Sequence, residues 1–142
     1  MNIKKTSELT ETEKVLVDTA IDMMNMSYAP YSRFSVGAAL LSADGKVFTG
    51  CNIENGAFSA TVCAERTAFF KAVSEGTRKF EAIAIAGGRE GIVTSFCPPC
   101  GTCRQVMSEF CDPDIFRVIL TDGKQNVREY FLSELLPYGF GL

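Results

Sequence analysis

Apolar residues recur at helical spacing in two stretches of the chain, and a third helix is predicted beside a group of cysteines. The first helix begins at Thr10, which with Glu13 fits a capping box. The second ends at Gly76, because glycine commonly follows the last residue of a helix. The pattern predicts helices over residues 10–27, 61–76 and 101–110.

Shorter apolar runs bounded by turn residues predict strands between these helices. In "VGAALLSADGKVFTGCNI", two apolar runs meet at Asp44-Gly45, a dipeptide that suits the tight turn of a hairpin. "FEAIAIAGG" is short, apolar and ends in glycines, which is typical of a buried strand. "IFRVILTDGKQNVREYFL" predicts another strand, a second Asp-Gly turn and a short segment beyond it.

The predicted order is helix, hairpin, helix, strand, helix, strand and an apolar tail, "LPYGFGL". Strands that alternate with helices indicate a partly parallel sheet with helices packed on it, and the opening hairpin makes the sheet mixed. With 142 residues, 46% of them apolar and 22% charged, we expect one α/β domain over residues 1–142.

Charge and hydropathy exclude several classes of partner. The net charge is −3 and no Lys/Arg run is longer than Lys4-Lys5, so we expect no nucleic-acid polymer as partner. No apolar run is long enough to span a membrane, and the N-terminus shows no signal peptide. We therefore expect a cytoplasmic protein whose thiols stay reduced. Six cysteines in that compartment indicate metal binding or catalysis, with a disulfide framework as the alternative.

Three of these cysteines stand where two predicted helices begin. Cys63 opens the second helix, and Cys100 and Cys103 lie one turn apart at the start of the third. Helix N-termini favour thiolates, the form that binds metal. If both helix starts meet at one end of the sheet, three thiolates converge on one ion, and three protein ligands with an open fourth position is the pattern of catalytic zinc.

Neighbouring residues add chemistry to this predicted site. Glu65 lies two residues from Cys63, where a carboxylate can take a proton from water and pass it to a substrate. Three thiolates overcompensate the charge of Zn²⁺, so a cation is needed nearby. Arg66 and Arg104 both qualify, and we favour Arg66 for charge compensation.

Cys97 leaves a second possibility open. Cys97-Pro98-Pro99-Cys100 has the same spacing as the Cys100–Cys103 pair, but its prolines remove N–H donors that thiolates need. We prefer Cys97, Cys51 and Cys111 as packing thiols. A structural zinc site closed by Cys97 remains the non-enzymatic alternative, and a metal spectrum that separates four sulphurs from three would decide it.

The motifs Cys63-Ala64-Glu65 and Pro99-Cys100-Gly101-Thr102-Cys103 closely resemble those of the small cytidine deaminases of pyrimidine salvage, over essentially the whole chain. The resemblance implies a three-layer α/β/α sandwich, a Zn²⁺ ion on the three cysteines, and Glu65 as the catalytic proton shuttle. It also implies cytidine and deoxycytidine as substrates and a homotetramer.

Other stretches carry the resemblance into the substrate site. "PYSRFSVGAAL" is similar to the segment that supplies an aromatic residue to the base pocket, and "NIENGAF" to the loop that holds the ribose. The tail corresponds to one that reaches a neighbouring subunit. The substrate-binding residues implied are Phe34, Asn52, Glu54, the backbone of Ala64, and Phe140.

Three departures and two related groups of deaminases qualify the resemblance. Phe58 stands where many relatives carry tyrosine, and neither Cys97 nor the second proline before the motif is usual. The aminonucleoside antibiotic deaminases share the fold and the three cysteines, but the intact Asn52–Glu54 loop favours an ordinary ribose. Polynucleotide deaminases typically use histidine as first ligand, and this chain has none.

Overall fold

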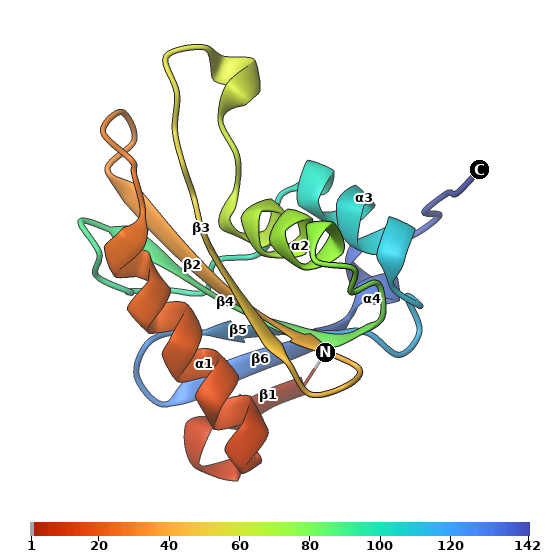
Figure 1. The fold of residues 1–142 in the computed structure, drawn as a ribbon. Helices are drawn as coiled ribbons and strands as arrows, with labels where there is room; N and C mark the ends of the chain where they lie inside the picture. Colours follow the sequence, from red (N-terminus) through yellow and green to blue (C-terminus); the bar gives the residue numbers. More distant parts are fainter. Residues whose placement is uncertain (1) are drawn as a thin grey trace.

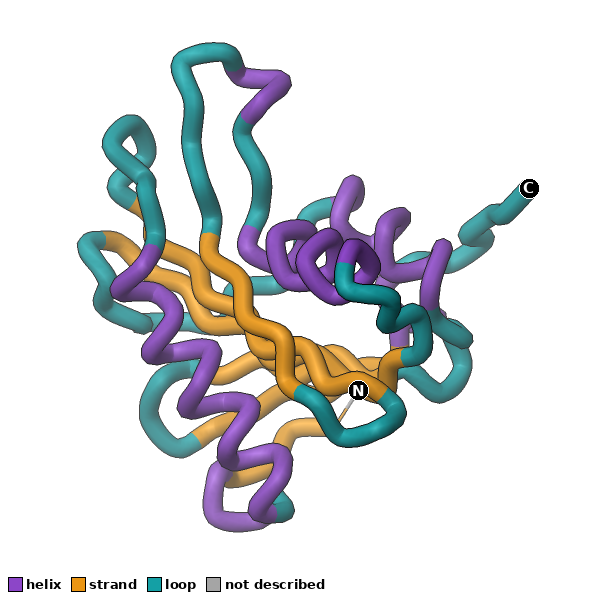
Figure 2. The backbone as a smooth tube through the Cα atoms, in the orientation of Figure 1, coloured by secondary structure: helices purple, strands orange, loops and turns teal. Residues whose placement is uncertain are grey.

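A computed structural model describes residues 2–142 and shows a mixed six-stranded sheet with helices on both faces (Figures 1 and 2). This confirms the predicted α/β/α sandwich. The strands lie in the order β1-β6-β5-β4-β2-β3. The elements are β1 (Asn2–Lys5), α1 (Glu11–Met23), β2 (Phe34–Ser42), β3 (Val47–Cys51), α2 (Ala64–Ser74), β4 (Phe80–Arg89), α3 (Gly101–Phe110), β5 (Arg117–Thr121), β6 (Asn126–Phe131) and α4 (Leu132–Leu135).

The neighbouring strands of this sheet are antiparallel except for β4 and β5, which run parallel because α3 carries the chain from one to the other. Helix α1 packs on one face of the sheet, while α2 and α3 pack on the other (Figure 1). No helix in the described chain has the length and apolar character that crossing a membrane requires. The parallel pair places the end of β4 close to the start of α3.

Residues that alternate along the central strands form two different cores. On the α1 face, β4 contributes only alanines, at positions 82, 84 and 86. On the opposite face, Ile83 and Ile85 pack with the fully buried Phe69 of α2 and Phe116. Period-two alternation therefore places small side chains under α1 and large ones under α2 and α3.

Helix α2 lies unusually close to β3 at Gly50. A Cβ atom on Gly50 would lie 2.2 Å from the carbonyl oxygen of Ala64 and 2.7 Å from the amide nitrogen of Ala68. Only glycine allows this approach. The contact fixes the height of the first turn of α2 above the sheet.

The predicted helices are confirmed, the third over the same residues and the first two with shorter ends. Thr10 caps α1 through the expected capping box: its Oγ1 accepts from the Glu13 N–H at 3.2 Å, and Glu13 Oε1 accepts from the Thr10 N–H at 3.0 Å. The α-helix ends at Met23, and a 3-10 turn follows over Met24–Met26. The second helix begins at Ala64 rather than at residue 61, because Cys63 has extended backbone angles as its N-cap.

Strand β1 is absent from the predicted elements, and the segment after the second Asp-Gly turn is the strand β6. Charged groups join β1, β6 and the neighbouring β5 to α1. Arg117 Nη1 lies 2.7 Å from Glu13 Oε2 and 3.3 Å from Glu129 Oε1, and Lys4 Nζ lies 2.9 Å from Glu129 Oε2. Such long-range pairs leave no periodic signal in a polar strand of four residues.

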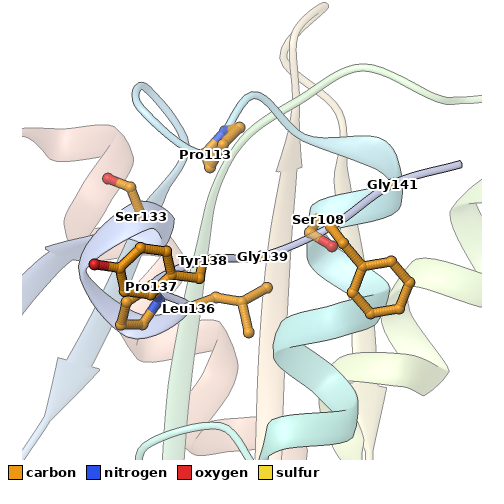
Figure 3. Close-up of a pocket in the computed structure, with 9 residues that line it drawn as sticks. Ser108, Pro113, Ser133, Leu136, Pro137, Tyr138, Gly139 and Gly141 are labelled. Carbon is orange, nitrogen blue, oxygen red and sulfur yellow. The ribbon is translucent and has the colours of Figure 1, made fainter.

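The C-terminal tail folds over the ends of α3 and α4. A cavity of about 390 Å³ lies between these helices and the tail (Figure 3). Ser108 and Ser133 line it on the helical side, and Leu136, Pro137, Tyr138 and Gly139 line it on the tail side (Figure 3). The last residues then project away from the sheet (Figure 1).

Candidate metal centre

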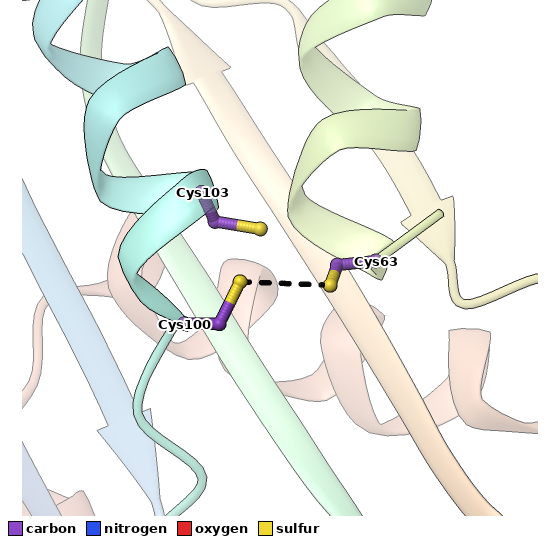
Figure 4. Close-up of side chains that lie close together, drawn as sticks. All are labelled: Cys63, Cys100 and Cys103. Atoms are coloured by element: carbon purple, nitrogen blue, oxygen red, sulfur yellow. Dashed lines mark hydrogen bonds between the residues drawn. The ribbon is translucent and has the colours of Figure 1, made fainter. Parts of the chain in front are cut away.

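The N-termini of α2 and α3 bring three cysteines together. Cys63 is the N-cap of α2, Cys100 is the N-cap of α3, and Cys103 is buried in the first turn of α3. Cys63 Sγ and Cys100 Sγ lie 3.8 Å apart, and all three sulphurs lie within 4.8 Å of one another (Figure 4). Residues 37 positions apart therefore meet because both helices begin at the same end of the sheet.

The cluster fits a zinc ion. Two sulphurs that bind one tetrahedral zinc at about 2.3 Å each lie roughly 3.8 Å apart, which agrees with the separation of Cys63 and Cys100. Within the described chain, the cluster contains three cysteines and Cys97 lies outside it. The six cysteines are all unpaired, so the disulfide framework considered as an alternative is not formed.

Arg66 is the cation next to these sulphurs. Its Nη2 donates to Cys63 Sγ at 3.3 Å. Hydrogen bonds from Cys103 and Arg66 outweigh burial and lower the pKa of the Cys63 thiol to about 5. At neutral pH this sulphur is therefore a thiolate, the form that binds metal.

Arg104 has a different role from the one that its position in the sequence suggested. Its Nε donates to the carbonyl of Pro99 at 2.8 Å and its Nη1 donates to the carbonyl of Leu135 at 2.7 Å. It thereby ties the residue before Cys100 to the end of α4. No sequence pattern pointed to this function, because Leu135 lies 31 positions away.

Glu65 is buried in the first turn of α2, with 4% of its surface exposed. Burial raises the pKa of its carboxyl to about 7, with a further contribution from the negative Cys63. A group with this pKa accepts and releases protons readily near neutral pH, as a proton shuttle must.

The predicted base-binding Phe34 begins β2, and the predicted ribose-binding Asn52 and Glu54 follow β3 and bond to the segment around the start of β2. Asn52 Nδ2 donates to the Phe34 carbonyl at 2.8 Å, and Asn52 Oδ1 accepts from the Val36 N–H at 2.9 Å. Glu54 Oε1 accepts from the N–H groups of Tyr31 and Ser32 at 2.9 and 3.2 Å. Asn52 and Glu54 therefore fix the loop that leads into Phe34, whose side chain is 39% exposed.

Comparison with known proteins identifies this arrangement. A sequence profile described as the zinc-binding region of cytidine and deoxycytidylate deaminases matches residues 10–119. A cytidine deaminase from Sporosarcina psychrophila is 48% identical over 130 residues, which span 92% of this chain and 91% of the relative. The chain belongs to the cytidine deaminase family. The resemblance found from the motifs is thereby confirmed.

Solved structures of the cytidine deaminase family share the fold. The structure of the cytidine deaminase from Burkholderia pseudomallei matches with a TM-score of 0.80 and 43% identity. The match covers 93% of this chain and 100% of the Burkholderia chain. A blasticidin-S deaminase from Bacillus cereus is 31% identical over 140 residues, which span 94% of this chain and 95% of the relative.

Zinc is the cofactor of this member of the cytidine deaminase family, because the matching profile is that of a zinc-binding region and the three-cysteine cluster is a donor set that fits zinc.

The remaining predicted residues lie at different distances from the cluster. Ala64 is the first residue of α2, where backbone N–H groups have no partner inside the helix. Phe140 lies in the projecting tail, 68% exposed, and its carbonyl accepts from Gln105 Nε2 at 3.3 Å. The tail that carries Phe140 leads away from the sheet (Figure 1).

Proposed function

We propose that this protein catalyses the zinc-dependent hydrolytic deamination of cytidine and deoxycytidine, giving uridine or deoxyuridine and ammonia. The observation that carries this proposal is the buried Glu65 beside three converging thiols at two helix N-termini. The named relatives support the same reaction. We assign the enzyme to pyrimidine salvage in the cytoplasm.

In the proposed mechanism, Cys63, Cys100 and Cys103 hold the zinc ion, which when bound acts as a Lewis acid that makes water a nucleophile at neutral pH. Glu65 takes a proton from the attacking water and delivers it to N3 of the cytosine ring. The ring is thereby activated for addition at C4. Glu65 then carries the water's second proton, from the hydroxyl group now on C4, to the amine nitrogen; the C–N bond breaks, ammonia leaves and C4 becomes the carbonyl of uridine.

Other residues orient the nucleoside in this proposal. The exposed part of the Phe34 ring packs on the base, and the Ala64 N–H donates to its polar edge. Asn52 and Glu54 hold the ribose, because an amide and a carboxylate together supply a donor and acceptors for a hydroxyl. Their hydrogen bonds to the neighbouring loop keep both side chains in place before substrate arrives.

The exposed tail supports an assembly of several copies. Tyr138 and Phe140 are exposed aromatic residues at the end of the chain, and the arm between β3 and α2 carries the exposed Phe58. Large exposed apolar side chains that gather at such projections mark protein–protein contacts. We propose a homotetramer in which Phe140 reaches the substrate site of a neighbouring copy.

Ammonia release on addition of cytidine tests the reaction, with Glu65→Gln as the matched variant. Glutamine keeps the shape of the side chain but cannot shuttle protons. We expect the variant to keep its zinc and lose nearly all turnover. Retention of most of the activity by Glu65→Gln would rule out its role. Turnover of blasticidin S without turnover of cytidine would instead place the protein with the antibiotic deaminases.

A further inference from the structure

A gap in the side chains of β4 lies beneath the predicted base site. Gly87 of β4 pairs with Val36 of β2 and faces the same side of the sheet as Ile85, the side that α2 and α3 cover. A Cβ atom on Gly87 would lie 2.8 Å from Cys97 Sγ and 3.0 Å from Phe34 Cε1. The edge of the Phe34 ring and the thiol of Cys97 therefore share the space that any other residue at position 87 would fill.

Cys97 also lies close to the catalytic groups. Burial and the negative charges of Glu65 and Cys63 raise the pKa of the Cys97 thiol to about 12. Cys97 is thus a neutral side chain that packs at Gly87 beside Phe34 without joining the cysteine cluster.

The residues on both sides of Cys97 are anchored. The guanidinium of Arg128 lies 4.4 Å above the centre of the Phe96 ring, a cation–π distance. On the other side, Arg104 holds the carbonyl of Pro99. The backbone around Cys97 is therefore fixed from the sheet and from α3, so its sulphur can act as a rigid stop for a neighbouring ring.

We propose that Cys97 and Gly87 together position the Phe34 ring and so determine how tightly the pyrimidine base is bound. This inference rests on the proposed cytidine deamination and on Phe34 as a base-binding residue. A methyl group at position 87 pushes the ring and the thiol apart. Loss of the sulphur leaves a hole into which the ring can tilt. Both changes displace Phe34, in different directions.

A double-mutant cycle tests this arrangement. We expect Gly87→Ala to raise the KM for cytidine by about 5- to 20-fold through overpacking, and Cys97→Ala to raise it about 3- to 5-fold, with smaller changes in kcat. In Gly87→Ala/Cys97→Ala, the methyl group at position 87 loses its nearest clash, the sulphur at 2.8 Å, while Phe34 Cε1 at 3.0 Å and Cys97 Cβ at 3.1 Å remain. The KM of the double variant should therefore fall below that of Gly87→Ala and far below the product of the two single effects.

Cys111→Ala is the matched control, because Cys111 is also a buried thiol in the same core but lies at the far end of α3. It should lower the melting temperature and leave KM unchanged. Zinc content is measured for every variant. Effects that simply multiply in the double variant, or two single variants with wild-type KM, would overturn the proposal.

The aromatic NMR signals of the Phe34 ring, assigned with Phe34→Leu, give a readout that needs no turnover. They should shift in both single variants and move back towards their wild-type positions in the double variant. If the wild type does not deaminate cytidine but the ring signals follow this pattern, the proposed reaction fails and the positioning survives. Unshifted ring signals in both single variants would reject the positioning itself.

Discussion

The contact between Arg66 and Cys63 predicts a measurable contribution to zinc affinity. Arg66→Ala removes a positive charge that lies 3.3 Å from a thiolate ligand. Two unit charges at this distance interact by about 5 kcal/mol at an effective dielectric constant of about 20. This value is the upper limit for the loss of zinc-binding free energy. Water that replaces the guanidinium recovers part of this energy. Changes to residues that support metal ligands typically weaken binding 10- to 100-fold, so we expect a loss of about 1.4 to 2.8 kcal/mol.

In the metal-free protein the same change removes one hydrogen bond to the Cys63 thiolate and should cost less free energy of unfolding than it costs in zinc binding. The Nε atom of Arg66 is buried and has no hydrogen-bond partner in the described chain, so its removal also relieves an unsatisfied donor. Zinc affinity is measured by competition with a chromophoric chelator, and stability by urea unfolding in the presence of EDTA. We expect Arg66→Ala to lower the zinc affinity clearly and the free energy of unfolding in EDTA much less.

Lys71→Ala is the matched control for Arg66→Ala. It removes one positive charge from the same helix, but Lys71 Nζ bonds to Thr49 and not to a sulphur. Arg66→Lys keeps the charge and should fall between the wild type and the alanine variant. Equal zinc affinity in wild type and Arg66→Ala, or an equal loss in Lys71→Ala, would refute direct compensation by Arg66.

Three further predictions concern stability. Burial raises the pKa of Glu13, but hydrogen bonds from Thr10 and Arg117 outweigh it and hold the pKa below the ordinary value of 4.5. The stability that Glu13 contributes is therefore present above pH 4.5 and is lost as the pH falls through the lower pKa of the folded state. Urea unfolding from pH 6 to 3 should show a weaker pH dependence in Glu13→Gln than in the wild type. Gly50→Ala should lower the free energy of unfolding by roughly 3 kcal/mol through overpacking, whereas Gly141→Ala, with no atom within 4 Å of its added Cβ, should leave it unchanged. Zinc removal at a free zinc concentration about 100-fold above Kd should cost about 3 kcal/mol and lower Tm by roughly 10 °C, and an unchanged Tm would argue against zinc as a link between α2 and α3.

Sequence patterns predicted the elements that are determined by residues close together in the chain. Helix α1 is signalled by its capping box, and the β2–β3 hairpin by its Asp-Gly turn, because these features depend on residues a few positions apart. Strand β1 could not be predicted in this way. It pairs with β6, more than 120 positions away, and its polar residues are held by partners such as Glu129.

The same distinction applies to the candidate site, where the metal ligands could be predicted and the supporting contacts could not. The cysteine spacing indicated which side chains bind metal, but their convergence depends on two helices that start at one end of the sheet. The carbonyl contacts of Arg104 and the packing of Cys97 on Gly87 both join residues that only the tertiary structure brings together. Chemistry could therefore be predicted from the sequence, while the supporting contacts required the fold.

The alanine face of β4 limits which substitutions this protein can accept during evolution. Ala82, Ala84 and Ala86 are fully buried under α1, so each added methyl group must lift the helix or bend the strand. The opposite face packs Phe69 among several aromatic rings, where volume lost at one residue can be regained at a neighbour. Viable sequences should thus diverge freely in size around Phe69 and hardly at all beneath α1. A library that randomises each face separately would show this as two very different survival rates.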